Sequence, residues 1–516
     1  MKLNYKRTLL VGFAFFLISV FWQAYDSTIP MILTNKFGMS QFWSGVIMAI
    51  DNILALFMLP LFGALSDKVN TRHGKRTPFI VIGTVIACVA FVALSFVDNA
   101  QYGKIEAVSK IDDPQSLQLI YEQQADAKLI DAEGNEFVLS EKFSQEEFAS
   151  ITCKVEQDGE TITNPDYIDY VTPARHACVA EITDSDPSAL IIFIALLLVV
   201  LVAMATFRSP AVALMPDVTM KPLRSKANAI INLMGTAGGI LVLVLGMVFA
   251  TSAVNNAYMS YTAFYGVVAF VMLAALTIFL LTVREPQWAA EMRADSQRCG
   301  IEEEQAPDTA EKKGLSAGQK RSLLFLLASI VLWFFGYNAV TSKYSVYAQN
   351  ILDKDYNTTL LIAQAGAIVA YLPVGIIASK IGRKKTILTG VAMLTTAFFA
   401  AAFVRSNSST MLMNGLFLLA GVAWATINVN SFPMVVEMCS GSDTGKYTGF
   451  YYTASMAAQT ATPMISGWFM DKMGMTVLFP YAAIFAGAAF VTMLFVMHGD
   501  SKATPKKGLE AFDSED

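Results

Sequence analysis

The chain has 516 residues, of which 54% are hydrophobic and 15% are charged, and its formal net charge is −5 at neutral pH. A soluble domain usually carries about 25% charged residues, so this composition excludes an ordinary soluble globular protein and favours the membrane. The sequence has three histidines and neither a Walker-type phosphate loop nor a Cys-x-x-Cys pair, so we expect no metal site and no cofactor.

The first apolar stretch follows a charged N-terminus, MKLNYKR, and runs past Trp22 towards Leu33. Its length, and the lack of a small-x-small cleavage site before a soluble domain, favour a retained helix over a signal peptide. Eleven more apolar stretches are long enough to cross about 30 Å of hydrocarbon as helices. Because backbone groups must pair internally in lipid, we expect an all-α integral membrane protein. The twelve stretches are 8–34, 43–66, 78–98, 188–209, 225–252, 260–283, 321–348, 357–380, 385–404, 410–434, 446–470 and 476–498.

These stretches form two groups of six, which predicts two six-helix bundles. Basic residues gather at 2–7, 68–76 and 380–385, and the positive-inside rule places these segments in the cytoplasm. Both termini are then cytoplasmic, in a multi-pass protein of the cell (plasma or inner) membrane. The predicted divisions are 1–98 for helices 1–3, 99–186 for an insert, 187–283 for helices 4–6, 284–320 for a central cytoplasmic loop, 321–498 for helices 7–12 and 499–516 for a cytoplasmic tail.

The predicted insert, 99–186, is strongly acidic and falls outside the cytoplasm. It contains 19 Asp and Glu against 6 Lys and Arg, a net charge of −13, whereas the whole chain carries −5. Its length suits a small folded module. It also holds Cys153 and Cys178, the two cysteines that we place outside the cytoplasm. Because that compartment permits disulfides, we predict a bridge between them, with two free thiols as the alternative.

One gap-free shift aligns the two groups of helices. The loop that starts at Gly63 has a counterpart 312 residues later, at Gly375. The same shift places FWQAYD (21–26) over WFFGYN (333–338), so that Asp26 falls on Asn338. Such a repeat predicts a pseudo-twofold axis with the binding site between the halves. Asp26 is also a carboxylate at membrane depth, which makes it a functional candidate in its own right.

The loop GALSDKVNTRHGKRTP (63–78) resembles the signature loop of the major facilitator superfamily, and GIIASKIGRKKT (375–386) resembles a degraded second copy. Glycines let helices approach closely, while charged residues at helix ends form contacts that break during switching. Snorkelling positive-inside charges would explain the basic residues, but not the glycines or Asp67. We therefore predict a gate built from Gly63, Asp67, Lys68, Arg72, Gly74, Lys75, Arg76, Asp217, Arg224, Gly375, Gly382, Arg383 and Glu437.

Two longer segments resemble particular families within this superfamily. SDKVNTRHGKRTPFI (66–80) and SPAVALMPDVTMKPLRSKANAIINLMG (209–235) resemble loops of the sucrose-transporter-like and glycoside–pentoside–hexuronide symporters. This resemblance implies a sugar–cation symporter. Melibiose-type sodium symporters carry two aspartates in the second span, where this chain has Ala55 and Leu59. Plant sucrose carriers have an arginine where Val212 stands, and Arg208 lies one turn earlier.

Three ionisable residues are candidates for proton coupling: Asp26, Asp51 and Arg208. The two aspartates fall in the outer-to-middle part of consecutive helices, where carboxylates that share a poorly solvated site raise one another's proton affinity. Asp51 also fits a helix start near the headgroups, and Arg208 fits a side chain that snorkels to the cytoplasmic surface. The segment AYDSTIP (24–30) resembles the first span of proton-coupled sugar porters, which implies a titrating Asp26.

Amides and aromatic rings are the groups that recognise sugar hydroxyls and the apolar faces of sugar rings. Each amide in the helices also fits interhelical hydrogen bonding, and tryptophans also fit the membrane interface. Further aromatic candidates are Trp22, Trp333 and Trp424. The predicted substrate-binding residues are Tyr25, Asn52, Asn228, Asn232, Tyr337, Asn338, Lys343, Gln364, Asn428 and Gln459.

Together these features predict a monomeric secondary transporter that works by alternating access. It carries a proton together with a sugar, which is either a disaccharide or a glycoside. A sodium-coupled or non-sugar transporter of the same fold is the main alternative. A transporter-like sensor would bind its ligand on the insert. An intramembrane enzyme would use Asp26 and Asp51, but no further catalytic motif accompanies them. We expect a small-molecule substrate and a lipid bilayer as partners, no enzymatic activity and no nucleic acid.

Overall fold

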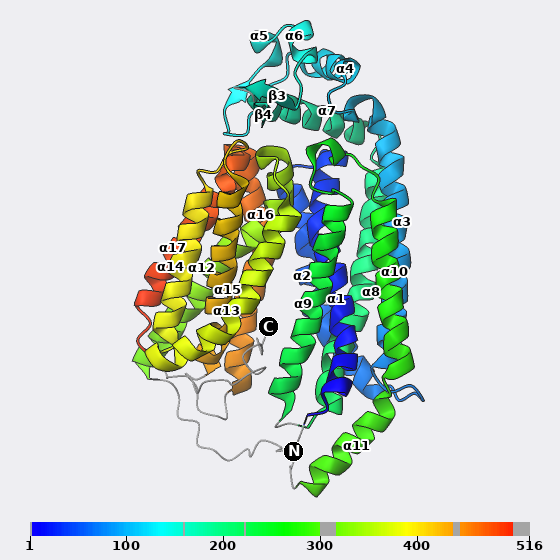
Figure 1. Ribbon diagram of the computed structural model, residues 1–516, viewed down its shortest axis with the longest axis vertical. Coiled ribbons are helices and arrows are strands. Elements are labelled where there is room, and N and C mark those ends of the chain that lie inside the picture. Colours follow the sequence, from blue (N-terminus) through cyan, green and yellow to red (C-terminus); the bar gives the residue numbers. More distant parts are fainter. Residues whose placement is uncertain (1–2, 158–159, 221–222, 300–315, 437–443, 499–516) are drawn as a thin grey trace.

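The structure is a computed structural model that describes residues 3–157, 160–220, 223–299, 316–436 and 444–498. Two helical bundles stand side by side, and a small module covers one end of both (Figure 1). The first bundle contains α1 (Tyr5–Met31) with a π-helical end (Ile32–Lys36), α2 (Gln41–Lys68), α3 (Thr77–Ser109), α8 (Ser188–Val218), α9 (Arg224–Val248) and α10 (Thr262–Thr282). The second contains α12 (Ala317–Tyr347) with a π-helical end (Ala348–Leu352), α13 (Tyr356–Ile381), α14 (Arg383–Ala401), α15 (Thr410–Val436), α16 (Thr444–Met473) and α17 (Leu478–Leu494).

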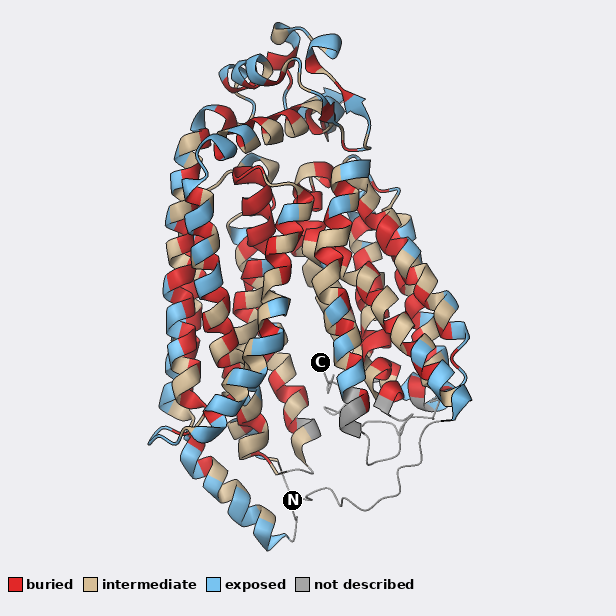
Figure 2. Ribbon diagram, turned by 180° about the vertical axis from the view of Figure 1, so that it is seen from behind, coloured by how far each residue is buried: buried red, intermediate tan, exposed pale blue. Residues whose placement is uncertain are grey.

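Among the described residues, nine helices are long and apolar enough to cross a membrane. They comprise the six helices of the first bundle together with α12, α15 and α17. Many large apolar side chains are exposed, including Phe57, Phe270 and Leu281. Exposed and buried residues alternate along the helices of both bundles (Figure 2). An apolar surface this extensive is expected of a protein that sits in lipid rather than in water.

Local capping chemistry sets several helix starts. The Ser40 side chain accepts a hydrogen bond from the main chain of Trp43 at the start of α2. Asp355 caps α13 in the same way, and Ser316 forms a reciprocal capping box with Gln319 at the start of α12. These caps satisfy main-chain N–H groups that the first turn of a helix leaves unpaired.

The module at one end, which we call the insert, follows directly from α3. That helix continues to Ser109, past the predicted boundary at residue 99. The insert then contains α4 (Pro114–Gln124), α5 (Leu139–Lys142), α6 (Gln145–Ala149), a π-helical turn (Tyr167–Val171) and α7 (Thr172–Ser185). It also contains two antiparallel hairpins, β1 (Leu129–Ile130) with β2 (Glu136–Phe137) and β3 (Lys154–Gln157) with β4 (Glu160–Thr163). The all-α prediction therefore does not hold for this module, which has its own apolar core around residues such as Phe148 and Val171.

The predicted disulfide of the insert is wrong, because both cysteines are free. The Cys153 thiol lies 3.0 Å from Oδ2 of Asp112, and the Cys178 thiol lies 2.7 Å from Oε1 of Gln123. Each thiol is thus buried in the insert core against a different neighbour. Burial raises the pKa of Cys178 to about 11, so this thiol is protonated and unreactive at neutral pH.

The predicted central loop is partly helical. Within it, α11 (Glu285–Arg298) follows the first bundle at the end opposite the insert. Arg7 of α1 donates to the carboxylate of Glu291 at 2.5 Å and lies over the ring of Trp288. These contacts fix α11 to the N-terminal end of α1.

Candidate functional site

A cavity of about 630 Å³ lies between the two bundles. Its volume falls within the range of about 300–1,000 Å³ that is usual for small-molecule sites. Seven helices contribute described residues to its lining: α1, α8 and α9 from the first bundle, and α12, α13, α14 and α15 from the second. Of these, α8 and α14 contribute one residue each, Arg208 and Phe398.

One face of α1 forms much of the wall. Its lining residues recur at alternating spacings of three and one, as expected for a single face of an α-helix. The face ends in Gln23, Asp26 and Ser27, and Asp26 is solvent-exposed because its side chain reaches the cavity. The complete set on α1 is Phe15, Ile18, Ser19, Trp22, Gln23, Asp26 and Ser27.

The three predicted coupling residues lie within electrostatic range of one another. The carboxyl group of Asp26 interacts electrostatically with Asp51 on α2 and with Arg208 on α8. Among the described residues, neither aspartate forms an ion pair within 4.0 Å, whereas Asn52 donates to the Asp51 carboxylate at 2.9 Å. Arg208 lies over the ring of Trp22, 5.7 Å from its centroid, and therefore faces the cavity rather than a headgroup surface. Among the described residues that line the cavity, Asp26 and Arg208 are the two that carry charge, and their charges are opposite.

Amides and aromatic rings complete the wall. Gln364 of α13 donates to Gln23 at 2.9 Å, which joins the two bundles across the cavity. The rings of Tyr337 and Trp424 stack with centroids 3.6 Å apart and form a flat aromatic surface. The combination offers both hydrogen-bonding groups and an apolar platform to a ligand.

Of the predicted substrate-binding residues, Asn232, Tyr337 and Gln364 line the cavity. Tyr25 is instead fully buried beside Phe21 in the first bundle. The lining formed by the described residues does not include Tyr25, Asn52, Asn228, Asn338, Lys343, Asn428 or Gln459. Sequence reasoning missed Gln23, Ser27 and Thr236, although the first two could have been found from their helical spacing relative to Asp26.

The register of the internal repeat also differs from the 312-residue shift. The π-helical ends of α1 and α12, Ile32–Lys36 and Ala348–Leu352, begin 316 positions apart. The caps of the following helices, Ser40 and Asp355, lie 315 positions apart. Because α2 has 28 residues and α13 has 26, no gap-free shift can match both the first helices and the loops. The 315-residue shift of the caps places Thr341, a cavity residue, at the position of Asp26, and the 316-residue shift of the π-helical ends places Ser342 there, so Asn338 is not the structural counterpart of Asp26.

The bundles are joined at the insert end by α2 and α16. Asp471 of α16 accepts hydrogen bonds from the main-chain N–H groups of Gln41 at 2.7 Å and Phe42 at 2.8 Å, so it caps α2 from the opposite bundle. Lys343 is fully buried and donates to the main-chain carbonyl of Gln41 at 2.6 Å. Gly467 lies where a Cβ atom would meet this carbonyl at 2.2 Å, so the crossing requires glycine.

A second set of contacts at the same end joins the π-helical ends. Asn35 donates to Gln349 at 2.8 Å and accepts from Asn350 at 2.8 Å. Gln349 also donates to the carbonyl of Thr251 at 3.1 Å. We refer to Asn35, Gln41, Lys343, Gln349, Asn350 and Asp471 together as the insert-end gate.

At the opposite end, Arg76 brings the predicted gate residues together. Its guanidinium donates to Asp67 at 2.5 Å, to Asp217 at 2.7 Å and to Ser66 at 2.5 Å. The loop between α2 and α3 is thereby tied to the end of α8 within the first bundle. Glu285 of α11, which the sequence analysis missed, accepts main-chain hydrogen bonds at the start of α3, and Gly74 leaves room for its carboxylate.

The other predicted gate residues that the structure describes differ in exposure and in contacts. Lys68 and Arg72 are exposed, and Arg224 donates to the main-chain carbonyls of Pro216 and Thr219. Gly63 packs against α8, Lys75 donates its main-chain N–H to Glu285, and Gly382 adopts a φ of 95° between α13 and α14. Gly375 has open space around it, Arg383 is half-buried at the start of α14, and Glu437 lies outside the described residues.

Two helical bundles around a central cavity, joined to each other at one end, have the architecture of a membrane transporter. The family comparison agrees. The model described as "Major Facilitator Superfamily" matches residues 177–431 and 354–513, and the model described as "MFS/sugar transport protein" matches residues 10–107. Since the first model covers more than half of the chain, the protein belongs to the major facilitator superfamily.

Similarity to curated proteins is local. "MFS-type transporter ppzB" of Metarhizium rileyi (strain RCEF 4871) is 28% identical over 130 residues, 25% of this chain and 26% of the relative. YagG of Escherichia coli (strain K12), which carries the name of a glycoside/cation symporter, is 34% identical over 71 residues, 13% of this chain and 15% of the relative. The matches thus span about a quarter of one relative's length and less than a fifth of the other's.

Similarity to solved structures extends over nearly the whole chain. The xylose transporter XylE of E. coli, solved in an inward-open conformation, has a TM-score of 0.55 at 14% identity over 97% of this chain and 98% of its own. A D-xylose-proton symporter gives 0.56 at 14% over 98% and 100%. A bacterial homologue of the iron transporter ferroportin gives 0.57 at 10% over 96% and 99%. At these identities the likeness is one of fold alone.

Proposed function

We propose that the protein is a proton-coupled symporter of an uncharged sugar, a disaccharide or a glycoside. The observation that carries this proposal is the position of Asp26. It is a carboxylate in the middle of a membrane helix, exposed to the cavity and close to Arg208. Placing an ionisable group at that depth costs free energy, so such residues usually have a function, and reversible proton binding is one such function.

The sugar assignment is supported by the neighbours of Asp26. Gln23, Gln364 and Asn232 offer amide groups, and the stacked Tyr337 and Trp424 offer an aromatic face. Sugars need both, because their hydroxyls require hydrogen bonds and their C–H faces pack on rings. The name of YagG, a glycoside/cation symporter, points in the same direction.

The proposed topology has twelve spans, with both termini in the cytoplasm and the insert outside. The helices α13, α14 and α16 would supply the three spans beyond the nine that are apolar enough on their own. In α13, the polar side chains of Gln364 and Tyr371 line the cavity instead of facing lipid. Apart from the bond of Gln364 to Gln23, the described hydrogen bonds between the bundles lie at the insert end, so this conformation would face the cytoplasm.

The proposed cycle starts with the cavity open to the outside. Asp26 takes up a proton from that side, and the sugar binds between the bundles. The insert-end gate then forms while the bundles rock, and the sugar and the proton leave together on the cytoplasmic side. Asp51 and Arg208 would adjust the proton affinity of Asp26 during this change.

The proposal is tested by uptake of radiolabelled disaccharides and glycosides into proteoliposomes that contain the purified monomer. An imposed inward proton gradient should concentrate one of these sugars, and a proton ionophore should abolish the accumulation. A sodium gradient at equal pH on both sides provides the comparison. Accumulation with sodium but not with protons would contradict the coupling assignment, and accumulation of none of the sugars would contradict the substrate class.

A further inference from the structure

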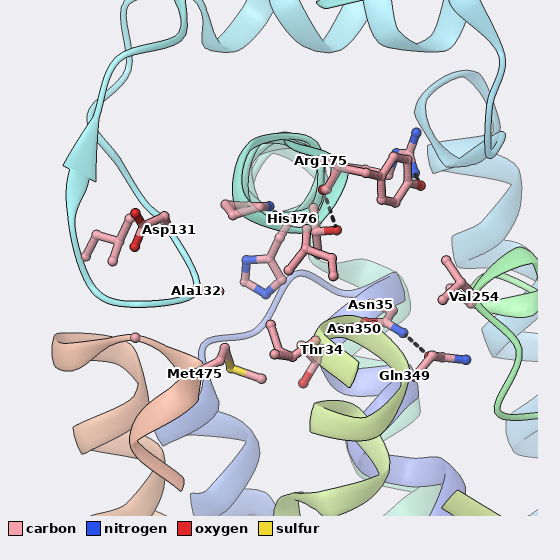
Figure 3. A pocket seen from close by; sticks show the side chains of 18 of the residues that line it. Thr34, Asn35, Asp131, Ala132, Arg175, His176, Val254, Gln349, Asn350 and Met475 are labelled. Atoms are coloured by element: carbon pink, nitrogen blue, oxygen red, sulfur yellow. Dashed lines mark hydrogen bonds between the residues drawn. The ribbon is translucent and has the colours of Figure 1, made fainter. Parts of the chain in front are cut away.

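A second cavity, of about 310 Å³, lies between the insert and the ends of both bundles. Its walls come from three parts of the molecule: α7 and β1 of the insert, the π-helical end of α1, and the π-helical end of α12 with the turn after α16 (Figure 3). This cavity is separate from the central one. Its volume is at the lower end of the range for small-molecule sites.

The charged side chains on its walls are mostly satisfied by the protein. Asp471 holds two main-chain amides at the start of α2, and Asp353 accepts from Thr163 at 2.8 Å and pairs with Lys154 of β3. Asp131 accepts from three groups of its own turn, and Arg175 donates to Tyr167 at 2.6 Å. Among the described lining residues, Lys128 is a cation without such a partner, and it is exposed to solvent. Arg175 is the enclosed charged group of the described lining that keeps an unpartnered N–H, at Nε.

The other side chains on the wall that can still form hydrogen bonds are uncharged. His176 points from α7 into the cavity (Figure 3), with Nε2 at 3.2 Å from the carbonyl of Met39. The hydrogen bond described for the ring involves Nε2 and not Nδ1, and Oε1 of the buried Gln41 has no hydrogen-bond partner among the described residues. Burial lowers the pKa of His176, against the opposing effects of the Met39 hydrogen bond and the Asp471 charge, so the ring is uncharged at neutral pH.

Apolar side chains cover the rest of the surface, and they come from the insert and from the ends of both bundles. They include Ile111, Leu129, Ile168, Val254, Ile351 and Met475. A site with a few neutral polar groups on an apolar surface suits a ligand with hydroxyls on one side and an apolar face on the other.

We propose that this cavity is a second ligand site, which binds a small uncharged ring compound such as a single-ring glycoside. The choice of ligand rests on the proposed sugar specificity of the transporter. Because the walls belong to the insert and to both bundles, the site exists only while the insert-end gate is closed. A ligand there favours the closed state by its differential affinity and lies outside the transport cavity.

The test is equilibrium dialysis of the purified full-length protein with radiolabelled methyl glucoside, at neutral pH. The wild type should bind two equivalents. Ala177→Phe places a ring into the insert cavity and should remove one equivalent, while Glu181→Phe, on the exposed face of the same helix, should remove none. His176→Leu removes the ring nitrogens and should weaken the same equivalent without filling space. Gln364→Ala, in the central cavity, should weaken the other equivalent about tenfold, so that it is lost at a glucoside concentration near the wild-type Kd.

These outcomes separate the two proposals. A single equivalent that is lost in Gln364→Ala and unaffected by Ala177→Phe and His176→Leu would overturn the insert site and leave the transport site standing. A single equivalent that is lost in Ala177→Phe and unaffected by Gln364→Ala would contradict the central sugar site instead. No bound glucoside in the wild type would contradict both. Retention of the central equivalent in Ala177→Phe also shows that this variant is folded.

Discussion

Gln364 of α13 donates a hydrogen bond to Gln23 of α1 at 2.9 Å, and this pair joins the two bundles at the level of the central cavity. Gln23 stands three residues before Asp26 on the same helical face, so the pair lies next to the only carboxylate among the described residues that line this cavity. Among the described residues, Oε1 of Gln364 has no partner. The pair therefore connects the proposed sugar site, the proposed proton site and the contact between the bundles.

We expect Gln364→Ala to weaken sugar binding about tenfold, because a hydrogen bond to a ligand hydroxyl is worth about 1 kcal/mol or somewhat more. The matched control is Gln459→Ala, which removes the same side chain from α16, where it does not line the cavity. Its affinity should stay within about twofold of the parent. Direct titration of the purified variants measures both. An equal loss in the two variants would place the sugar elsewhere.

Asp26→Asn should abolish accumulation against a gradient, because the amide can no longer take up and release a proton. Exchange of labelled for unlabelled sugar should persist, since the amide keeps the hydrogen-bonding shape of the protonated acid. The comparison variant is Asp51→Asn, whose carboxylate does not line the cavity, and which should shift the pH dependence of uptake but keep accumulation. Accumulation by Asp26→Asn would assign coupling to another group.

Asp471→Ala should open the insert end more often. It removes a carboxylate cap from the start of α2, and a cap of this kind is typically worth about 1 kcal/mol. We expect a several-fold faster reaction of Thr341→Cys, a cavity reporter, with a membrane-impermeant maleimide added from the insert side. Lys472→Ala, an exposed neighbour, is the control and should leave the rate unchanged. A lower or unchanged rate in Asp471→Ala would show that this contact does not hold the gate closed.

Arg76→Lys should slow transport about tenfold even though the charge is kept. The guanidinium of Arg76 contacts Asp67, Asp217 and Ser66 at once, and a single ammonium cannot reproduce that planar arrangement. Arg72→Lys changes an exposed residue of the same loop and should have little effect. Initial uptake rates, normalised to the amount of protein in the membrane, compare the two variants. Equal rates would show that the loop needs only positive charge.

The stability of the insert should depend on pH through Asp169. Burial, together with the charges of Asp131 and Glu133, raises the pKa of Asp169 to about 6. A carboxyl group with a raised folded-state pKa destabilises the fold as pH increases from its unfolded value towards pH 6, and by a constant amount above that. Asp169→Asn should therefore stabilise the insert by about 1 kcal/mol at pH 7.5, with little effect at pH 4.

Hydrogen exchange of amides in α4 and α7 measures this local stability. Asp184→Asn, at an exposed position of the insert, is the control and should show no such difference between the two pH values. A stabilisation that is the same at both pH values would point to packing instead of charge.

The sequence by itself determined the membrane character, the two groups of helices, the acidic insert and the transporter class. Long apolar runs, charge asymmetry and the glycine-containing loop motif are local properties, and they do not depend on how helices pack. Asp26 could be singled out for the same reason, because one carboxylate in an apolar run is conspicuous without any knowledge of its neighbours. The loop motif likewise predicted that Asp67, Arg76 and Asp217 act together, and the structure brings them into contact.

Only the tertiary structure decided which side chains reach the cavity and which partners close its ends. Tyr25 and Tyr337 look alike in sequence, yet Tyr25 is buried within its bundle and Tyr337 lines the cavity, because the packing of each helix decides which of its faces meets the cavity. The structure also decided that Cys153 and Cys178 have different neighbours and form no bridge. Asp471 caps α2, and Lys343 contacts Gln41, although the residues in each contact lie far apart in the chain. Such contacts depend on the distance between side chains in the folded protein, which residue type and spacing along the sequence do not encode.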